Sequence, residues 1–184
     1  MSLEAIEITK AIEVIRSGEP LLLSTDFGWE VAFHAEHGLP KAVEFIDCLK
    51  PHEAAYRPLV WFSSEGQQER WLDPIPEIAY DLLDQTDSEI ILALTPKNSN
   101  KLCENDKIRV RIAKNKALQQ FINRVKAPII TLNPLKTIAD SFAALDSEIL
   151  KGVHYVVPLH DQKFIKRPES SIALDSAGRI SIID

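Results

Sequence analysis

The amino-acid sequence predicts an α/β fold in which helices pack on a twisted, mixed β-sheet. Short apolar segments of strand length are interleaved with longer segments in which apolar residues recur every three or four positions. The two kinds of segment do not alternate strictly, which favours a mixed sheet. Hydrophobic residues make up 45% of the 184 positions, enough for one domain or at most two small lobes. Because no repeat or low-complexity segment divides the chain, we expect residues 1–184 to form a single domain.

The N-terminal region is expected to begin with a helix over residues 4–17 and to continue into a short buried strand. The apolar face of this helix consists of Ala5, Ile8, Ile12 and Ile15. Gly18 is suited to ending the helix. The continuous apolar residues 21–23 then predict a strand covered on both faces, and this strand ends in the tripeptide Ser-Thr-Asp at residues 24–26.

The remaining elements follow from apolar periodicity and from the Pro, Gly and polar residues between the periodic segments. Helices are expected over residues 39–49, 75–84, 115–125 and 137–151. Strands are expected over residues 58–62, 89–94, 107–112, 128–131, 153–157, 171–174 and 179–183.

The expected strand over residues 107–112 alternates strictly between basic and apolar side chains. Lys107, Arg109 and Arg111 therefore share one face of the strand. This basic face has two interpretations. One is a solvated face of the sheet, and the other is an anion-binding site, since a guanidinium group presents a planar pair of donors to phosphate or carboxylate.

The charge of the chain argues against strong non-specific binding of nucleic acid. The net charge is −6, whereas such binding grows with the number of phosphates that basic groups neutralise. The basic residues are unevenly spread, however, because residues 107–126 contain seven Lys or Arg and no acid. The sequence therefore predicts a local basic surface on an acidic protein.

Several kinds of protein and site are disfavoured. No apolar run reaches the length of about 20 residues that spans a bilayer, and the N-terminus lacks the basic segment of a secretory signal. Cys48 and Cys103 match no metal spacing and are expected to be reduced thiols of a cytoplasmic protein. His34 and His37 have no evident third ligand, so no metal site is predicted. The six glycines are not clustered, which argues against a Gly-rich phosphate loop.

Two polar segments besides the basic face are candidates for function. The Ser-Thr-Asp tripeptide at residues 24–26 is expected either to cap the turn that follows its strand or to form part of a binding site. Ser170 and Ser171 precede a late strand, where an ordinary turn is the simpler interpretation. Local sequence alone leaves both pairs of alternatives open.

The order of these segments resembles the YrdC-like family over nearly the whole chain. The first strand of that family runs into Pro-Thr-Asp-Thr-Val-Trp/Tyr-Gly. Here the corresponding strand ends in Ser-Thr-Asp-Phe-Gly-Trp-Glu, which brings Thr25, Asp26 and Trp29 into register with the family motif.

Later motifs extend the resemblance. The family has a helix ending in Leu-Lys and a strand starting at Lys-Pro-Leu, where this chain has Lys50 and the Arg-Pro-Leu of residues 57–59. Arg111 and Pro128 stand 17 positions apart, as do the Arg of a later family strand and the Pro that opens the next one. The Ser-Ser-Ile of residues 170–172 is similar to the Pro-Ser-Ser/Thr-Ile of the family.

The resemblance implies a twisted open sheet with a concave, positively charged cleft. Well-known members of the family use ATP, threonine, bicarbonate and a divalent metal such as Mg²⁺ to make threonylcarbamoyl-AMP for tRNA modification. Asn133 is a candidate because it can reach the space of the family Asn, whose own position is Leu135 here. The residues that the resemblance places in the cleft are Thr25, Asp26, Trp29, Lys50, Arg57, Arg109, Arg111, Thr131, Asn133, Ser170 and Ser171.

The chain departs from the family at positions that carry the chemistry. Ser24 replaces a Pro, Phe27 replaces a Thr, and Glu30 replaces a Gly, which brings a carboxylate near the expected place for anions. His52 stands where an Arg is expected, and a mostly neutral imidazole lacks the bidentate guanidinium. The scaffold is therefore expected to be better preserved than the site.

Three functional hypotheses follow. The first is a divergent YrdC-like protein without synthase activity that binds a nucleotide such as ATP or AMP, an amino acid such as threonine, or RNA. The second is an active threonylcarbamoyl-AMP synthase that uses replacement residues. The third is a module that binds double-stranded RNA through the basic segment 107–126, although the net charge of −6 opposes it.

Overall fold

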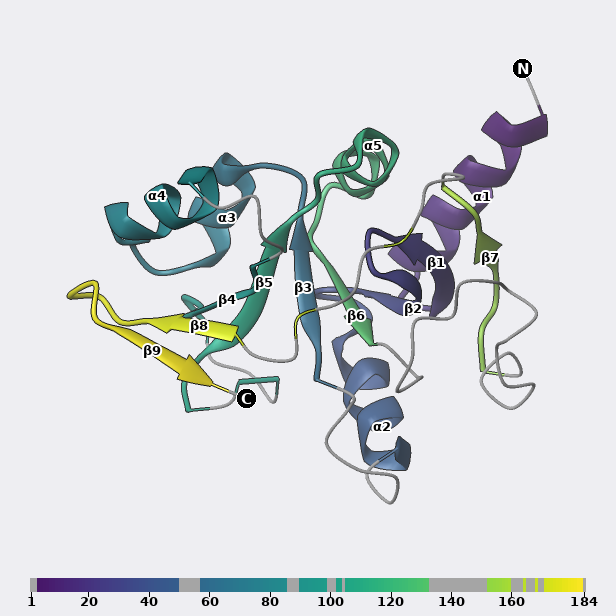
Figure 1. The fold of residues 1–184 in the computed structure, drawn as a ribbon. Coiled ribbons are helices and arrows are strands. Elements are labelled where there is room, and N and C mark those ends of the chain that lie inside the picture. Colours follow the sequence, from purple (N-terminus) through teal and green to yellow (C-terminus); the bar gives the residue numbers. More distant parts are fainter. Residues whose placement is uncertain are drawn as a thin grey trace.

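A computed structural model describes residues 3–49, 57–85, 90–98, 102–103, 105–132, 152–159, 164, 168 and 171–183 of the chain. Within these residues nine strands form one sheet, in the order β7-β1-β2-β6-β3-β5-β4-β8-β9 (Figure 1). The strands are β1 (Leu21–Thr25), β2 (Gly28–His34), β3 (Leu59–Phe62), β4 (Leu92–Leu94), β5 (Ile108–Ile112), β6 (Ile129–Leu132), β7 (Val156–Val157), β8 (Ser171–Leu174) and β9 (Ile180–Ile183). The helices are α1 (Leu3–Arg16), α2 (Leu39–Leu49), α3 (Glu65–Trp71), α4 (Glu77–Gln85) and α5 (Lys116–Val125).

The sheet is mixed, as the sequence predicts. β3 runs parallel to β5 and antiparallel to β6, while β1 and β2 form an antiparallel hairpin. β4 pairs with β8 in parallel and with β5 in antiparallel orientation. Strands β6, β3 and β5 lie at the centre of the sheet, between the β1–β2 hairpin and the β4, β8 and β9 strands (Figure 1).

Both faces of the sheet are buried beneath helices, which produces two separate apolar clusters. Leu59 and Trp61 of β3 belong to the cluster that contains residues of α1 and α5. Val60 and Phe62, the alternate residues of the same strand, belong to a second cluster with Ala42 of α2 and with residues of α4. Because neighbouring strand residues point to opposite faces, α1 and α5 cover one face and α2 and α4 lie against the other.

Helix α5 shows why the sequence folds locally as it does. Asn115 precedes the helix, and its side-chain oxygen accepts hydrogen bonds from the N–H groups of Ala117 and Leu118. Such a cap satisfies donors that the first turn of a helix leaves without partners. Lys126 ends the helix in a left-handed conformation with φ of 66°. The residues buried against the sheet are Leu118, Phe121, Ile122 and Val125.

The structure contains two elements that the sequence pattern did not predict. Strand β2 buries Glu30 and His34 among its apolar residues, so its sequence lacks the continuous apolar run of β1. Helix α3 buries Gln67 and Gln68, and polar residues on the inner face conceal the amphipathic period. Strand β4 is shorter than the expected segment 89–94, and the helix expected over residues 137–151 lies outside the described residues.

The junction between β2 and α2 is organised by His34. Its Nδ1 accepts hydrogen bonds of 3.2 Å from the backbone N–H groups of Glu36 and His37. The His34 ring stacks on that of His37 at 4.4 Å. Burial of His34, followed by the charge on His37, lowers the pKa of the imidazole below its ordinary value. None of the helices in the described part of the chain has the length and apolarity that spanning a bilayer requires.

Phe121→Ala is expected to reduce the free energy of unfolding by about 3–5 kcal/mol, because it removes a fully buried ring between α5 and the sheet. Gln120→Ala is the matched control, since Gln120 is exposed on the same helix and its loss is expected to change stability by less than about 0.5 kcal/mol. Urea unfolding followed by tryptophan fluorescence measures both values. Equal stability of the two variants would contradict the packing described.

The stability contributed by His34 is expected to fall as the pH drops below its ordinary pKa of 6.5. In that range the unfolded chain takes up a proton on His34, while the folded protein keeps the imidazole neutral, so protonation favours unfolding. Above this pH both states are neutral and the contribution is constant. His34→Asn keeps a side-chain acceptor but cannot titrate. Urea midpoints measured from pH 7.5 to 5 should therefore depend less on pH in the variant, and equal slopes would contradict this interpretation.

Candidate functional site

The sheet face that α1 and α5 cover also carries buried polar side chains from four strands. Glu30 comes from β2, Thr131 from β6, Arg109 and Arg111 from β5, and Ser171 from β8. All five are nearly inaccessible to solvent, with exposed fractions between 0% and 6%. We refer to these five residues as the polar row.

One end of the polar row is a chain of hydrogen bonds between β3, β6 and β2. The Trp61 Nε1–H donates to Thr131 Oγ1 at 2.8 Å, and the Thr131 hydroxyl donates to Glu30 Oε2 at 2.8 Å. A hydroxyl has one proton to donate, and here that proton is directed at Glu30. A ligand that needs the Thr131 hydroxyl as a donor must therefore compete with a buried carboxylate.

The guanidinium of Arg111 packs against two aromatic rings that also contact each other. Its central carbon lies 4.5 Å from the centre of the Phe27 ring and 5.8 Å from that of Trp61. Its Nη1 donates to the carbonyl of Ile90 at 3.1 Å. Cation–π contacts of this kind become stronger when the cation is removed from water, as it is here with 4% of Arg111 exposed.

Arg109 continues the polar row toward β8. Its Nε donates to Ser171 Oγ at 3.0 Å, and Lys107 Nζ donates to the carbonyl of Leu174 at 2.6 Å. The alternation of basic and apolar residues predicted for this strand is present. The interpretation of its basic face as solvated is wrong, because Arg109 and Arg111 are buried and bind groups of neighbouring segments.

The Ser-Thr-Asp tripeptide holds the β1–β2 hairpin in place. Thr25 Oγ1 accepts from the Phe27 N–H and donates to the carbonyl of Gly28, which closes the turn. Gly28 has φ of 114°, a conformation that side chains disfavour. Asp26 Oδ2 accepts from the Lys114 N–H at 3.2 Å, so the turn is tied to the end of β5.

These contacts agree with the turn-capping interpretation of the tripeptide, and they also bring it to the polar row. Asp26 anchors the turn beside β5, and Phe27 in the same turn lies over Arg111. Ser24 Oγ accepts from the Leu159 N–H at 2.7 Å, which connects β1 to the segment that follows β7.

The remaining candidates lie in other places. Trp29 packs against the apolar cluster on the opposite face of the sheet. Arg57 lies two residues before β3, whose first residue Leu59 pairs with Thr131. Lys50, Asn133 and Ser170 lie outside the described residues.

Sequence reasoning did not identify the aromatic part of this site. The sequence predicts the strand over residues 58–62 without assigning a role to Trp61, and it gives Phe27 only as a departure from the family motif. The indole N–H of a buried tryptophan was the available signal, because such a group normally has a hydrogen-bond acceptor. Across the described residues no three His, Cys, Asp or Glu side chains gather into a group able to hold a metal ion.

Thr131→Val is expected to destabilise the protein by about 1–3 kcal/mol, because it leaves the buried Trp61 N–H without its acceptor and removes a donor from Glu30. Thr131→Ser keeps the hydroxyl and is expected to recover most of this loss. Urea unfolding gives both values. If the valine variant were as stable as the serine variant, the hydrogen-bonded chain would not have the role assigned to it.

Comparison of the whole chain with known proteins gives a clear result for structure alone. No family model and no curated protein matches the sequence. Sua5 from P. abyssi superimposes with a TM-score of 0.68 at 19% identity, over 91% of this chain and 52% of its own. YciO from E. coli gives a TM-score of 0.70 at 17% identity, over 98% of this chain and 89% of its own.

A third similar structure is full-length HypF in a phosphate- and nucleotide-bound form. It matches with a TM-score of 0.65 at 16% identity, over 96% of this chain and 28% of HypF. The chain thus spans about half the length of the Sua5 structure and most of YciO. The TM-scores establish the fold, while sequence identities this low leave the activity open. This chain has the fold of the YrdC-like domains.

Proposed function

We propose that this chain is a divergent YrdC-like domain that binds a small anionic ligand of low charge, with AMP as the representative nucleotide, and that does not synthesise threonylcarbamoyl-AMP. The observation that carries the proposal is the position of Phe27, which replaces a family threonine and lies 4.5 Å over the guanidinium of Arg111.

The loss of synthase activity follows from what adenylyl transfer requires. Negative charge accumulates on the phosphates during transfer, and it is stabilised by cations and hydrogen-bond donors directed at the reacting group. Phe27 and Trp61 cover the Arg111 guanidinium, and the Thr131 hydroxyl donates to Glu30. The carboxylate of Glu30 adds repulsion toward a triphosphate.

The charges of the polar row support binding of a small anion. The polar row contains two guanidinium groups and one carboxylate, so its positive charge is nearly balanced. A monophosphate or carboxylate suits this balance better than ATP. ATP is expected to require Mg²⁺ as a counter-ion. Similar folds bind small molecules, since HypF has a phosphate- and nucleotide-bound form and P. abyssi Sua5 has been crystallised with L-threonine.

The double-stranded RNA hypothesis has less support. The net charge of −6 opposes binding to a duplex, because affinity for its backbone grows with the number of phosphates that basic groups neutralise. The exposed basic residues of the segment are Lys114, Lys116, Arg124 and Lys126. These four residues belong to α5 and its two flanks. Binding of a small ligand is the preferred proposal.

Calorimetric titration of the protein with AMP, with ATP and Mg²⁺, and with threonine tests the proposal. AMP is expected to bind more tightly than ATP, because it carries less negative charge into a site that contains Glu30. A parallel assay with ATP, threonine, bicarbonate and Mg²⁺ is expected to release no pyrophosphate above the rate without protein. Turnover at a rate typical of enzymes, about 1 s⁻¹ or faster, would overturn the proposal.

Glu30→Gln is expected to strengthen AMP binding about tenfold, or about 1.4 kcal/mol, since it removes a buried negative charge and keeps an acceptor for Thr131. Glu13→Gln removes an exposed charge of α1 and serves as the control, with unchanged affinity. If neither the natural chain nor the Glu30→Gln protein bound AMP, the polar row would not be a ligand site.

A further inference from the structure

Strand β9 is the outermost strand of the sheet, at the end away from β7 (Figure 1). It pairs with β8 along Ile180–Ile183, and no strand of the described residues pairs with its other side. Its side chains are also poorly covered, since Ile180 is 50% exposed and Ile182 is 73% exposed. The strand therefore presents both apolar side chains and backbone groups to its surroundings. We refer to residues 180–183 as the outer edge.

The backbone groups that point outward from the outer edge belong to Ile180 and Ile182. Ile182 stands opposite Ile172 of β8, and the Ile172 N–H donates in the other direction, to the carbonyl of Ile91. In an antiparallel pair of strands, opposite residues that exchange hydrogen bonds alternate with opposite residues that do not. The pairs Ile172–Ile182 and Leu174–Ile180 are therefore of the second kind, and the N–H and C=O groups of Ile180 and Ile182 point away from β8.

The outer edge lacks the features that normally prevent two sheets from pairing through their edges. Such features are charged side chains, a proline, a β-bulge or a very short strand. Residues 180–183 read Ile-Ser-Ile-Ile, and their register with β8 is continuous. At the other end of the sheet β7 has only two residues. Of the two ends of this sheet, β9 is therefore the one suited to accept a further strand.

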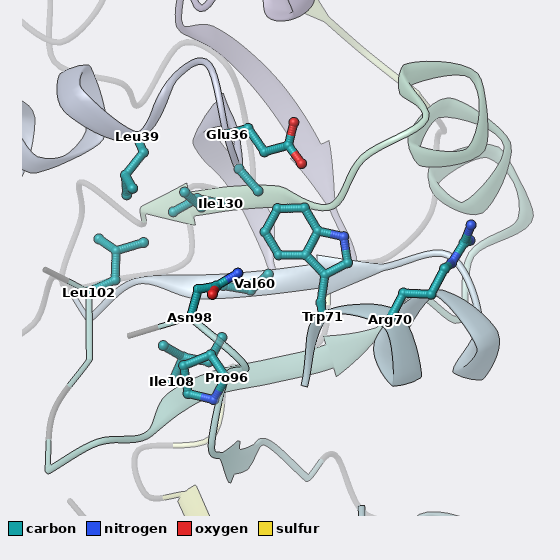
Figure 2. Close-up of a pocket in the computed structure, with 11 residues that line it drawn as sticks. Glu36, Leu39, Val60, Arg70, Trp71, Pro96, Asn98, Leu102, Ile108 and Ile130 are labelled. Carbon is teal, nitrogen blue, oxygen red and sulfur yellow. The ribbon is translucent and has the colours of Figure 1, made fainter. Parts of the chain in front are cut away.

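The exposed isoleucines belong to an apolar face of the sheet. Ile180 stands opposite Leu174, which lies in the apolar cluster beneath α2 and α4, and Ile182 stands opposite Ile172, which packs against that cluster. Opposite residues of paired strands lie on the same face. Further inward, side chains of α2 and α3 lie over this face, around a cavity of about 460 Å³ whose lining includes Leu39, Val60, Trp71, Ile108 and Ile130 (Figure 2). At β9 the same apolar face is exposed.

The turn between β8 and β9 holds the outer edge in place. Asp175 Oδ1 accepts hydrogen bonds of 2.9 Å from the N–H groups of Ala177 and Arg179. Asp175 Oδ2 accepts from Arg179 Nε at 2.6 Å. Gly178 completes the turn with φ of 75°. A strand that is already ordered loses less conformational freedom on pairing than a mobile segment does.

We propose that the outer edge binds a second copy of this chain, through antiparallel pairing of β9 with the partner's β9 about a two-fold axis at Ser181. The sequence around Ser181 is symmetric, Ile-Ser-Ile, so this register sets Ile180 of each copy opposite Ile182 of the other. Each such pair exchanges both of its outward N–H···O bonds, and the isoleucine side chains of both copies meet on one face. A two-fold interface uses the same surface on both copies, and this segment is complementary to itself.

Charge favours the antiparallel direction. Parallel pairing in register would set Arg179 beside the partner's Arg179, and like charges in opposite positions repel. Antiparallel pairing moves the two guanidinium groups to opposite ends of the interface. The interface is small, so the association is expected to be weak and to depend on protein concentration. It does not depend on the ligand proposed for the polar row.

Sedimentation equilibrium of the natural chain from about 10 µM to about 1 mM tests the inference. The average mass is expected to rise across this range from that of one copy toward that of two, as for a dissociation constant of about 100 µM. A chain that stays monomeric at about 1 mM would overturn the proposal, in favour of an extended segment of a different protein as the partner of this edge.

Ile182→Lys brings a charge from each copy into the interface and is expected to weaken the association at least about tenfold. The Ile182 side chain is exposed, so the urea midpoint should stay unchanged. Val156→Lys is the control, because Val156 is 36% exposed on β7 at the other end of the sheet, and it is expected to associate as the natural chain does. Equal association of the natural chain and the Ile182→Lys protein would overturn the proposal.

Cysteine substitution tests the register. At the two-fold axis, Ser181 and the partner's Ser181 form a pair without hydrogen bonds, whose Cα atoms lie about 4.5 Å apart, within the range that a disulfide bridges. Ser181→Cys is therefore expected to form a covalent dimer on oxidation, above the level given by the natural Cys48 and Cys103. Ile182→Cys is the control, since it is displaced from its counterpart by two residues, about 7 Å along the strand. Cross-linking of the Ile182→Cys protein but not of the Ser181→Cys protein would overturn the two-fold axis assigned to Ser181.

Discussion

A guanidinium buried against two aromatic rings constrains the centre of this sheet. Arg111 is 4% exposed, and a charge in that position must be compensated by its neighbours. Phe27 supplies one ring and Trp61 the other, while the Ile90 carbonyl accepts a hydrogen bond. The β1–β2 turn is therefore positioned by the same contact that positions the middle of β5. Asp26 strengthens this link by accepting a hydrogen bond from the backbone just after β5.

The fold and the site differ in how much sequence change they tolerate. A similar arrangement of strands and helices is kept at 17% and 19% identity to YciO and Sua5, because a core accepts many combinations of apolar residues of suitable volume. A site for phosphate chemistry needs particular donors in particular positions. Phe27 packs a ring against Arg111, and Glu30 accepts a hydrogen bond from Thr131, so the polar residues of this site do not follow from the similarity of the fold.

Apolar periodicity predicted most helices and strands, but the contacts that form the polar row join residues far apart in the sequence. The helix at residues 115–125 was predicted from its apolar face, and the structure adds Asn115 as its cap. Strand β2 was not, because burial of Glu30 depends on Thr131, a residue 101 positions away in the sequence. The burial of Arg109 likewise depends on β8, whose Ser171 accepts its hydrogen bond. The alternating pattern fixed which residues share a face, but it contained no information about what covers that face.

The ring of Phe27 over Arg111 also limits how this chain can change in the future. Replacing Phe27 by threonine alone would open a void above a buried cation, and removing Glu30 alone would deprive the Thr131 hydroxyl of its acceptor. Substitutions at residues in contact are not additive, so each reversal is costly unless its neighbours change as well. Introducing the threonine and glycine of the family motif at these positions without loss of stability therefore requires several simultaneous mutations.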